Sequence, residues 1–292
     1  MATLIRGAAG RLFLKEIGKL SICIMFQSER GFIMQKEIGP DAGIKRCGKI
    51  IAIVSNKGGV GTTTAATNIA TNLAGPNRPV CLVDLVLQFG SVASFLNVEP
   101  TFSVLDLVKS LRSATPLLLE DVLVQHASGV RILAEPLHRA GEPRIKPAEI
   151  DEVFDRLAQS FEFLVIDTPK AFDDMQILVL DRAEIILFVT EMDNPSLKSA
   201  RRAFDHFHRT GVDTRKIRVL LNRYIEIDKM NLEAVEKILG MNVFWTLPNN
   251  YPVVVSAVNR GLPIRMCDYG SDIGRSYADL PDALIRSISL PS

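Results

Sequence analysis

Short runs of β-branched and aliphatic residues alternate along the chain with segments in which apolar positions recur every three or four residues. The first pattern is typical of buried parallel strands and the second of amphipathic helices. The predicted strands are Lys49 to Ser55, Val80 to Asp84, Val130 to Leu133, Phe163 to Asp167, Glu184 to Thr190, Ile217 to Asn222 and Val243 to Leu247.

The clearest predicted helix runs from Leu197 to Arg209. Its apolar residues recur at helical spacing and form one inward stripe: Leu197, Ala200, Ala203, Phe204 and Phe207. The alternation of strands and helices predicts an α/β fold, a three-layer α/β/α sandwich with a mostly parallel sheet of about seven strands.

A change in composition near Gly43 to Lys49 divides the chain. We predict a short, loosely ordered leader over residues 1–47 and a single domain over residues 48–290. The leader is basic and then apolar between Arg11 and Phe26, which faintly resembles a signal peptide. No small-residue cleavage site follows, so a leader or a misplaced start is favoured over an export signal.

The composition is that of an ordinary globular protein, with a formal net charge of +1 and 47% hydrophobic residues. The 4 cysteines form no C-x-x-C pair, which favours a reduced, cytoplasmic compartment. No apolar stretch reaches the roughly 20 residues that span a bilayer, so we predict no integral membrane segment.

A glycine-rich segment follows the first predicted strand and opens the next helix. It consists of Lys57, Gly58, Gly59, Val60, Gly61, Thr62, Thr63 and Thr64. In the phosphate-binding pattern G-x-x-x-x-G-K-[ST], backbone N–H groups surround the phosphates, the lysine reaches the β and γ oxygens, and the hydroxyl binds Mg²⁺. Here Gly61-Thr62-Thr63 replaces Gly-Lys-Thr. The backbone cradle and the metal-binding hydroxyl are therefore present without the usual lysine, while Lys57 stands at the entrance of the loop.

Two acidic residues end predicted strands of the same sheet. Asp84 ends one strand, and Asp167, followed by Thr168-Pro169, ends another. Ligands of open α/β sheets bind at the carboxyl ends of strands, and a carboxylate after an apolar strand is typical of the Walker-B residue that helps to hold Mg²⁺. The alternative for Asp167 is a turn-forming residue. A dinucleotide-binding motif is disfavoured, because residues 59–64 lack the final glycine of G-x-G-x-x-G.

These motifs resemble those of the deviant Walker-A ATPases of the ParA/MinD group, whose loop has the pattern K-G-G-x-G-K-[ST]. The resemblance extends over about Lys49 to Ile288 and implies a P-loop NTPase-like fold. Within the group, the chain is most similar to the CpaE/TadZ pilus-assembly proteins, which often have a small residue instead of the second lysine and carry D-x-D-L-Q-F-G after the second strand. The segments that carry this likeness are Asp84-Leu85-Val86-Leu87-Gln88-Phe89-Gly90, Leu221-Asn222-Arg223, Leu247-Pro248-Asn249-Asn250-Tyr251 and Ala257-Val258-Asn259-Arg260-Gly261-Leu262-Pro263.

The resemblance implies ATP or ADP and Mg²⁺ as cofactors, and a nucleotide-dependent homodimer. Lys57 would reach across an ATP-sandwiched dimer to the other subunit's phosphates, and Thr63 would bind Mg²⁺ with help from Asp167. Asn222 would hydrogen-bond the adenine edge. The catalytic candidates are Lys57, Asp84 and Asp167. The nucleotide-binding candidates are Lys57, Gly58, Gly59, Val60, Gly61, Thr62, Thr63, Thr64, Asn222, Arg223, Pro248 and Asn249. Lys57 as a solvated loop lysine and Asn222 as a turn residue remain the alternatives.

Two departures from the family pattern remove a charge. Thr62 stands where the phosphate lysine is expected, and Val86 stands where the family has a second acidic residue. Phosphoryl transfer depends on positioning and charge stabilisation, so we expect hydrolysis to be weak or absent while nucleotide binding survives. Lys170 follows Asp-Thr-Pro, where the family has a small or apolar residue; its ammonium either replaces part of the missing charge or faces solvent.

The resemblance implies a CpaE/TadZ-like protein of the Flp/Tad pilus-secretion machine. It would act by forming nucleotide-responsive dimers that localise the machine, with little or no hydrolysis of ATP. Pilus and secretion proteins would be its partners, in the cytoplasm, at a cell pole or at the inner face of the membrane. The alternative is an active ParA-like ATPase that partitions DNA, based on Lys198, Arg201, Arg202, Arg209, Arg215, Lys216 and Arg218. DNA is the disfavoured partner because such a cluster is more often a solvated helix face. Membrane positioning like that of MinD ranks last, because residues 277–282 are acidic and contain a proline.

Overall fold

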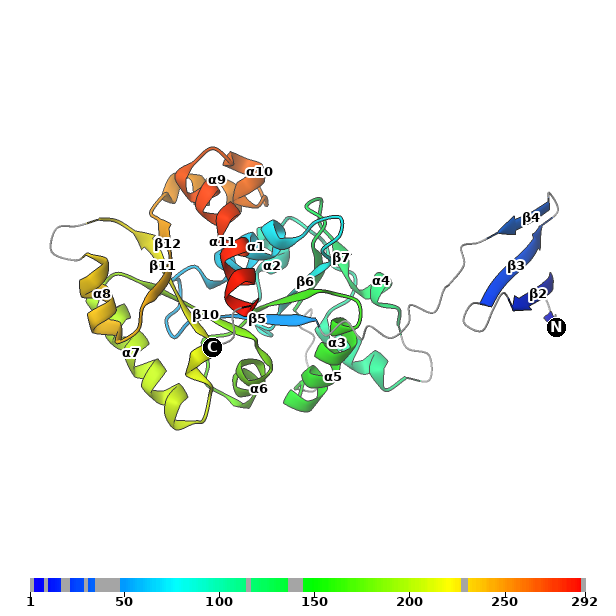
Figure 1. Cartoon of the computed structure of the whole chain (residues 1–292), viewed down its shortest axis with the longest axis horizontal. Coiled ribbons are helices and arrows are strands. Elements are labelled where there is room, and N and C mark those ends of the chain that lie inside the picture. The colour runs from blue at the N-terminus through cyan, green and yellow to red at the C-terminus, as the bar shows by residue number, and fades with distance from the viewer. Residues whose placement is uncertain are drawn as a thin grey trace. The chain divides into compact units, whose positions relative to one another are not determined.

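The computed structural model divides the chain into two units, Met1–Lys45 and Arg46–Ser292. It describes residues 3–7, 10–16, 22–28 and 31–34 of the first unit and residues 48–113, 117–135, 144–226 and 231–289 of the second (Figure 1). Within the first unit, four antiparallel strands lie in the order β1-β2-β3-β4. They are β1 (Thr3–Gly7), β2 (Gly10–Glu16), β3 (Ile22–Ser28) and β4 (Gly31–Met34). These strands were not predicted from the sequence, and the loose order of the leader stays a prediction.

The second unit is built on an eight-stranded sheet of order β12-β11-β10-β5-β9-β6-β8-β7. The strands are β5 (Lys49–Val54), β6 (Val80–Asp84), β7 (Val124–Gln125), β8 (Arg131–Leu133), β9 (Phe163–Asp167), β10 (Ile185–Glu191), β11 (Ile217–Tyr224) and β12 (Val243–Pro248). All neighbours are parallel except β7 and β8. The predicted α/β fold is confirmed. The antiparallel edge strand β7 was missed, because two residues are too short to show a period.

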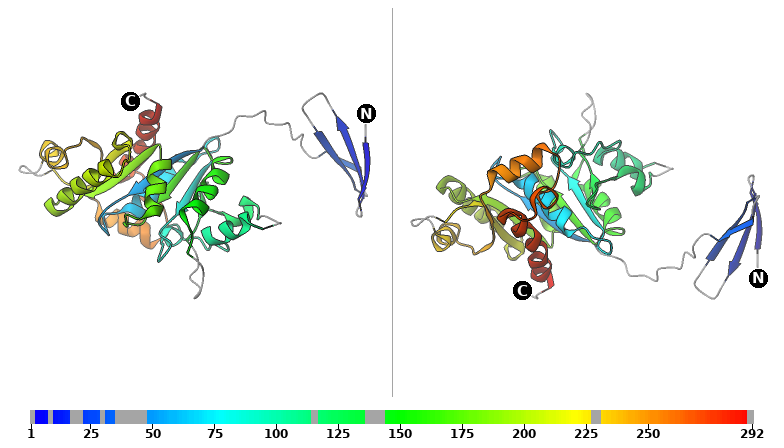
Figure 2. Two further views of the ribbon diagram at one scale, coloured as in Figure 1. Left: turned by 90° about the horizontal axis from the view of Figure 1, so that it is seen from below. Right: turned by 90° about the horizontal axis from the view of Figure 1, so that it is seen from above.

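Helices connect the strands and cover both faces of the sheet (Figure 2). They are α1 (Thr62–Leu73), α2 (Val92–Phe95), α3 (Val104–Leu111), α4 (Leu119–Val122), α5 (Pro147–Ala158), α6 (Asp174–Arg182), α7 (Asn194–Arg209), η1 (Thr214–Lys216), α8 (Leu232–Leu239), α9 (Tyr251–Asn259), α10 (Ile264–Asp268) and α11 (Asp272–Ser289). Helix α7 contains the predicted helix, and the predicted inward stripe is buried. In the described part of the chain, no helix is both long and apolar enough to cross a membrane.

The two faces of the sheet bury two separate cores, because successive side chains of a strand point to opposite faces. In β5, Ile50, Ala52 and Val54 join the core under α3, α5, α6, α7 and α8. Ile51 and Ile53 join the core under α1, α2, α9, α10 and α11. A strand covered on both sides must be apolar throughout, which is the pattern that the sequence shows. The carboxyl ends of β5, β6 and β9 therefore meet at one edge of the sheet, next to the start of α1.

Candidate functional site

Residues 55–61 connect β5 to α1 and form the phosphate loop of the site. Gly59 and Gly61 have φ angles of 79° and 96°, in the left-handed region that favours glycine. Gly61 is the N-cap of α1, and no side chain caps this helix. Within the described residues, the first N–H groups of α1 therefore receive no side-chain cap. These groups and the positive end of the helix dipole suit an anion. A Cβ added at Gly59 would meet nothing within 4 Å, so the space over this glycine is open.

The two threonines that open α1 have different partners. Thr62 Oγ1 donates a hydrogen bond of 2.8 Å to Ser55 Oγ, which ties it back to the end of β5. Thr63 Oγ1 donates a hydrogen bond of 2.7 Å to Asp167 Oδ2. The second carboxylate oxygen, Asp167 Oδ1, is buried and has no hydrogen-bond partner among the residues that the structure describes. The structure thus brings together the two predicted metal-binding side chains and leaves one buried oxygen available.

This donor set fits Mg²⁺ bound together with a phosphate. Mg²⁺ prefers oxygen ligands and is commonly held by one or two carboxylates plus phosphate oxygens and water. Thr63 and Asp167 offer a hydroxyl and a carboxylate at the open end of the loop. The described residues contain no cluster of three acidic, histidine or cysteine side chains that could hold a metal alone. Phosphate oxygens and water would complete the ligand shell.

Asp84 lies beside Asp167, because β6 and β9 are parallel neighbours and the two residues are paired in register. Its carboxylate accepts hydrogen bonds from the backbone N–H groups of Val86, at 3.0 Å, and Val92, at 3.1 Å. Burial raises the pKa of Asp84, and repulsion by Asp167 raises it further. Burial also raises the pKa of Asp167 to about 7, against the opposite effect of the Thr63 hydrogen bond. The pair therefore resists carrying two negative charges without a cation.

Glu135, which follows β8, is a member of this acidic group that sequence analysis missed. Its charge contributes to the raised pKa of Asp84, and its Oε2 atom is buried with no hydrogen-bond partner in the described part of the chain. Gly90 lies between the two side chains, since a Cβ there would fall 2.6 Å from Asp84 Oδ2 and 2.8 Å from Glu135 Cβ. The sequence did contain a signal for Glu135, because this acidic residue comes just after the predicted strand Val130 to Leu133 of the same sheet.

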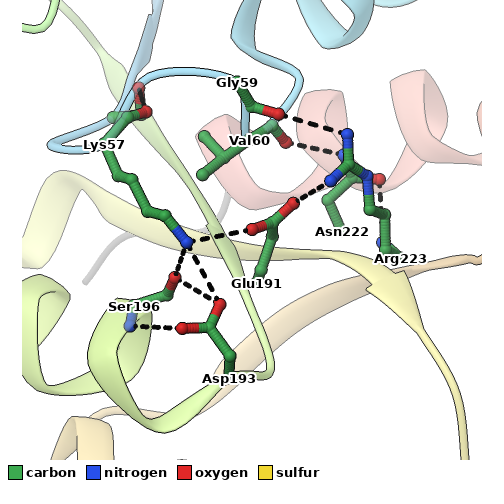
Figure 3. Close-up of polar contacts among 9 residues, drawn as sticks. Lys57, Gly59, Val60, Glu191, Asp193, Ser196, Asn222 and Arg223 are labelled. Carbon is green, nitrogen blue, oxygen red and sulfur yellow. Dashed lines mark hydrogen bonds and ion pairs between the residues drawn. The ribbon is translucent and has the colours of Figure 1, made fainter.

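Lys57 does not point into the phosphate loop (Figure 3). Its Nζ atom lies 2.8 Å from Ser196 Oγ, 3.3 Å from Asp193 Oδ2 and 3.4 Å from Glu191 Oε2. Asp193 is the N-cap of α7, and Glu191 ends β10. The entrance lysine is therefore paired with carboxylates of its own chain.

Asn222 and Arg223 lie on the other side of the loop, at the end of β11 (Figure 3). Asn222 Nδ2 donates to the carbonyl oxygen of Val60 at 2.7 Å. The Arg223 guanidinium bonds Glu191 Oε1 and, at 3.2 Å, the carbonyl oxygen of Gly59. The predicted adenine-side residues thereby hold the backbone of the phosphate loop.

A cavity of about 200 Å³ joins the loop to the predicted adenine side. Gly61, Thr64, Asn222, Arg223, Pro248 and Asn249 line it, so the structure brings these predicted residues together. Val254 and Tyr277, which also line it, were missed by the sequence analysis. Tyr251 and Val258 line it too and lie in segments that the sequence analysis singled out without naming them as site residues. An apolar cavity with a few amide groups is suited to a flat heterocyclic ring.

The raised pKa of Asp167 predicts opposite pH dependences for stability and for binding of magnesium nucleotide. A buried acid whose pKa is raised binds more protons in the folded than in the unfolded state, so stability should fall by roughly 2 to 4 kcal/mol between about pH 4 and pH 7. Metal binding needs the ionised carboxylate, so affinity for magnesium nucleotide should rise over the upper part of this range.

Urea unfolding and equilibrium binding at several pH values measure both effects. The variant Asp167→Asn should reduce both slopes relative to the wild type, because its amide does not titrate. A residual stability slope from Asp84, whose pKa is also raised by burial, should remain. If the variant keeps the wild-type slopes, Asp167 is not the group responsible.

Comparisons with known proteins agree with this geometry. A family model described as ParA, NUBPL iron-transfer P-loop NTPase, matches residues 46–217. The septum site-determining protein MinD of Thermotoga maritima is 24% identical over 241 residues, which cover 80% of this chain and 86% of that protein.

Two solved structures show the same fold. A ParA family ATPase from Chlorobium tepidum superposes with a TM-score of 0.73 at 19% identity and covers 80% of this chain and 98% of that chain. MinD of Pyrococcus horikoshii, solved in complex with Mg-ADP, superposes with a TM-score of 0.69 at 22% identity and covers 84% of this chain and 99% of that chain.

Proposed function

Because the chain belongs to the ParA family of P-loop NTPases, we propose that it is a nucleotide-responsive switch that binds ATP or ADP with Mg²⁺ and turns it over slowly. The observation that carries this proposal is the hydrogen bond of 2.7 Å from Thr63 Oγ1 to Asp167 Oδ2, beside the phosphate loop. The buried Asp167 Oδ1, which has no hydrogen-bond partner among the described residues, supports a cation-binding site at this place.

The loop N–H groups of residues 58–64 would hold the phosphates, Thr63 and Asp167 would hold Mg²⁺, and the cavity beside Asn222 would hold the base. Bound Mg²⁺ neutralises phosphate charge. Its positive charge would also offset the repulsion between Asp84 and Asp167, which favours the ionised form of both carboxylates.

Slow hydrolysis is supported by the two positions at which this chain lacks a charge. The Thr62 hydroxyl is uncharged and is directed to Ser55. Val86 contributes a backbone N–H to Asp84 and no carboxylate of its own. Preorganised charge is the main source of rate acceleration in phosphoryl transfer, and loss of one such group commonly costs about 100- to 1000-fold in rate.

The contacts of Lys57 support a switch between two states. In the structure, Lys57 is paired with Glu191 and Asp193 of its own chain. To meet the phosphates of a second subunit, it would have to leave both carboxylates. Nucleotide-dependent dimerisation would then depend on exchanging these ion pairs for phosphate contacts.

We propose that the switch acts in the Flp/Tad pilus-secretion machine. The chain would be a CpaE/TadZ-like protein that localises this machine, through protein partners, at a cell pole or at the membrane. The support is the sequence of residues 84–90 together with the uncharged residue at position 62. The alternative is an active ATPase that partitions DNA.

Within the described residues, several members of the basic cluster have partners of their own. Arg215 pairs with Asp213, Arg201 pairs with Asp205, and Lys216 donates to a backbone oxygen. These contacts do not favour the DNA alternative. A steep salt dependence of DNA affinity would be needed to support it.

The variant Lys57→Ala tests the proposed switch. Binding of a fluorescent ATP analogue with Mg²⁺ is measured while the oligomeric state is followed in the same samples. We expect the wild type to bind and to dimerise with nucleotide, and the variant to bind several-fold more weakly and to stay monomeric, because a phosphate-contacting cation is lost. The matched control is Lys237→Ala, since Lys237 is an exposed lysine of α8.

Absence of wild-type binding at millimolar nucleotide would overturn the proposal, and the fold would then serve as a scaffold. Dimerisation of Lys57→Ala equal to that of the wild type would overturn the role of Lys57 alone.

A further inference from the structure

Lys170 lies close to the phosphate loop at Gly58. It follows Asp167-Thr168-Pro169 in the connection between β9 and α6. A Cβ added at Gly58 would fall 2.8 Å from Lys170 Nζ and 3.7 Å from its Cδ and Cε atoms. The ammonium group and the end of its aliphatic stem are therefore placed over the first glycine of the loop, from a position more than a hundred residues away in sequence.

Unlike Lys57 and Arg223, Lys170 has no anionic partner among the described residues. Lys57 is paired with Glu191 and Asp193, and Arg223 is paired with Glu191. In the described part of the chain, no hydrogen bond or ion pair joins Lys170 to another residue, and its side chain is exposed. Its positive charge is thus available to a ligand.

The loop lacks a cation at the point where phosphate-binding loops ordinarily have one. In the usual pattern, the lysine before the metal-binding hydroxyl reaches the β and γ oxygens. Here that position is Thr62, whose hydroxyl donates to Ser55. A lysine ammonium acts as a point charge on a flexible stem, so the same charge can be supplied from a different backbone position.

We propose that Lys170 supplies part of the phosphate-binding charge that Thr62 does not. The ammonium of Lys170 contacts phosphate oxygens of a nucleotide held by residues 58–64. This inference rests on the proposed function, because it needs a nucleotide in the loop. It also predicts that the contribution of Lys170 grows with the charge of the phosphate chain.

The test is equilibrium binding of ATP, ADP and AMP, each with Mg²⁺, to the full chain and to Lys170→Ala. We expect Lys170→Ala to weaken ATP binding by about 10- to 100-fold, the range for a lost charge-assisted hydrogen bond, and to affect AMP little. Lys237→Ala, which removes an exposed lysine of α8, should bind like the wild type. Because Lys170 is exposed, the variant should keep the wild-type unfolding midpoint.

The double variant Thr62→Lys with Lys170→Ala gives an independent test. A lysine at position 62 should restore most of the lost ATP affinity if the side chains at positions 62 and 170 contact the same phosphate oxygens. The difference between wild type and Lys170→Ala should also shrink in high salt, because screening weakens an exposed cation–phosphate contact.

The outcomes separate this inference from the proposed function. If the wild type binds ATP and Lys170→Ala binds it equally well, Lys170 is a solvent-facing lysine and the inference is overturned. Equal losses for ATP and AMP would also overturn it, since they would indicate a structural effect. If the wild type binds no nucleotide, the proposed function itself fails.

Discussion

Gly61→Ala is expected to lower the free energy of unfolding by about 1 to 3 kcal/mol and to weaken nucleotide binding at least about 10-fold. Gly61 has a φ angle of 96°, so an alanine there is strained. The added Cβ would lie 2.5 Å from Asn222 Nδ2, which must then move. Movement of Asn222 leaves the Val60 carbonyl without the donor that holds the loop. Urea unfolding without nucleotide and equilibrium binding measure the two effects.

Gly59→Ala is the matched control for this prediction. Gly59 also has a positive φ angle, 79°, but a Cβ there would meet nothing within 4 Å. Both variants carry the backbone strain, and only Gly61→Ala carries the collision with Asn222. A stability loss in Gly61→Ala no greater than in Gly59→Ala would show that the Asn222 contact does not hold the loop.

Phe188→Ala is expected to lower the free energy of unfolding by about 3 to 5 kcal/mol, the largest stability effect that we predict. Phe188 is fully buried in β10, and its ring meets those of Phe204 and Phe207 of α7 edge to face, with centroids 4.8 Å and 6.3 Å apart. The substitution leaves a cavity between β10 and α7. Since domains are stable by only about 5–15 kcal/mol, a large part of the stability would be lost. Urea or thermal unfolding measures it.

Phe172→Ala is the control for this packing argument. Phe172 also meets Phe207 edge to face, at 5.2 Å, but it is 41% exposed. Its loss should cost less than about 1.5 kcal/mol, because partly exposed atoms leave no sealed cavity. Equal decreases in the free energy of unfolding for the two variants would show that the contribution of Phe188 to stability does not come from its burial in β10.

The strands around the site were predicted to within a few residues because their signals are local. β5, β6 and β9 are buried on both faces, so each is an apolar run that can be recognised without its neighbours. The glycines and threonines of the loop and the acids that end β6 and β9 are also local patterns. Their meeting at one edge follows from the rule that parallel strands align their carboxyl ends.

The sequence by itself determined the strand–loop–helix order, the threonine at position 62 and the carboxylates at the strand ends. Only the tertiary structure decided that Glu135 joins Asp84, that Lys57 pairs with Glu191, 134 residues away, and that Lys170 lies over Gly58. The physical reason is that periodicity and turn chemistry act over a few residues. Contacts between side chains from separate loops depend instead on how the strands are ordered in the sheet and on the rotamers that their surroundings allow.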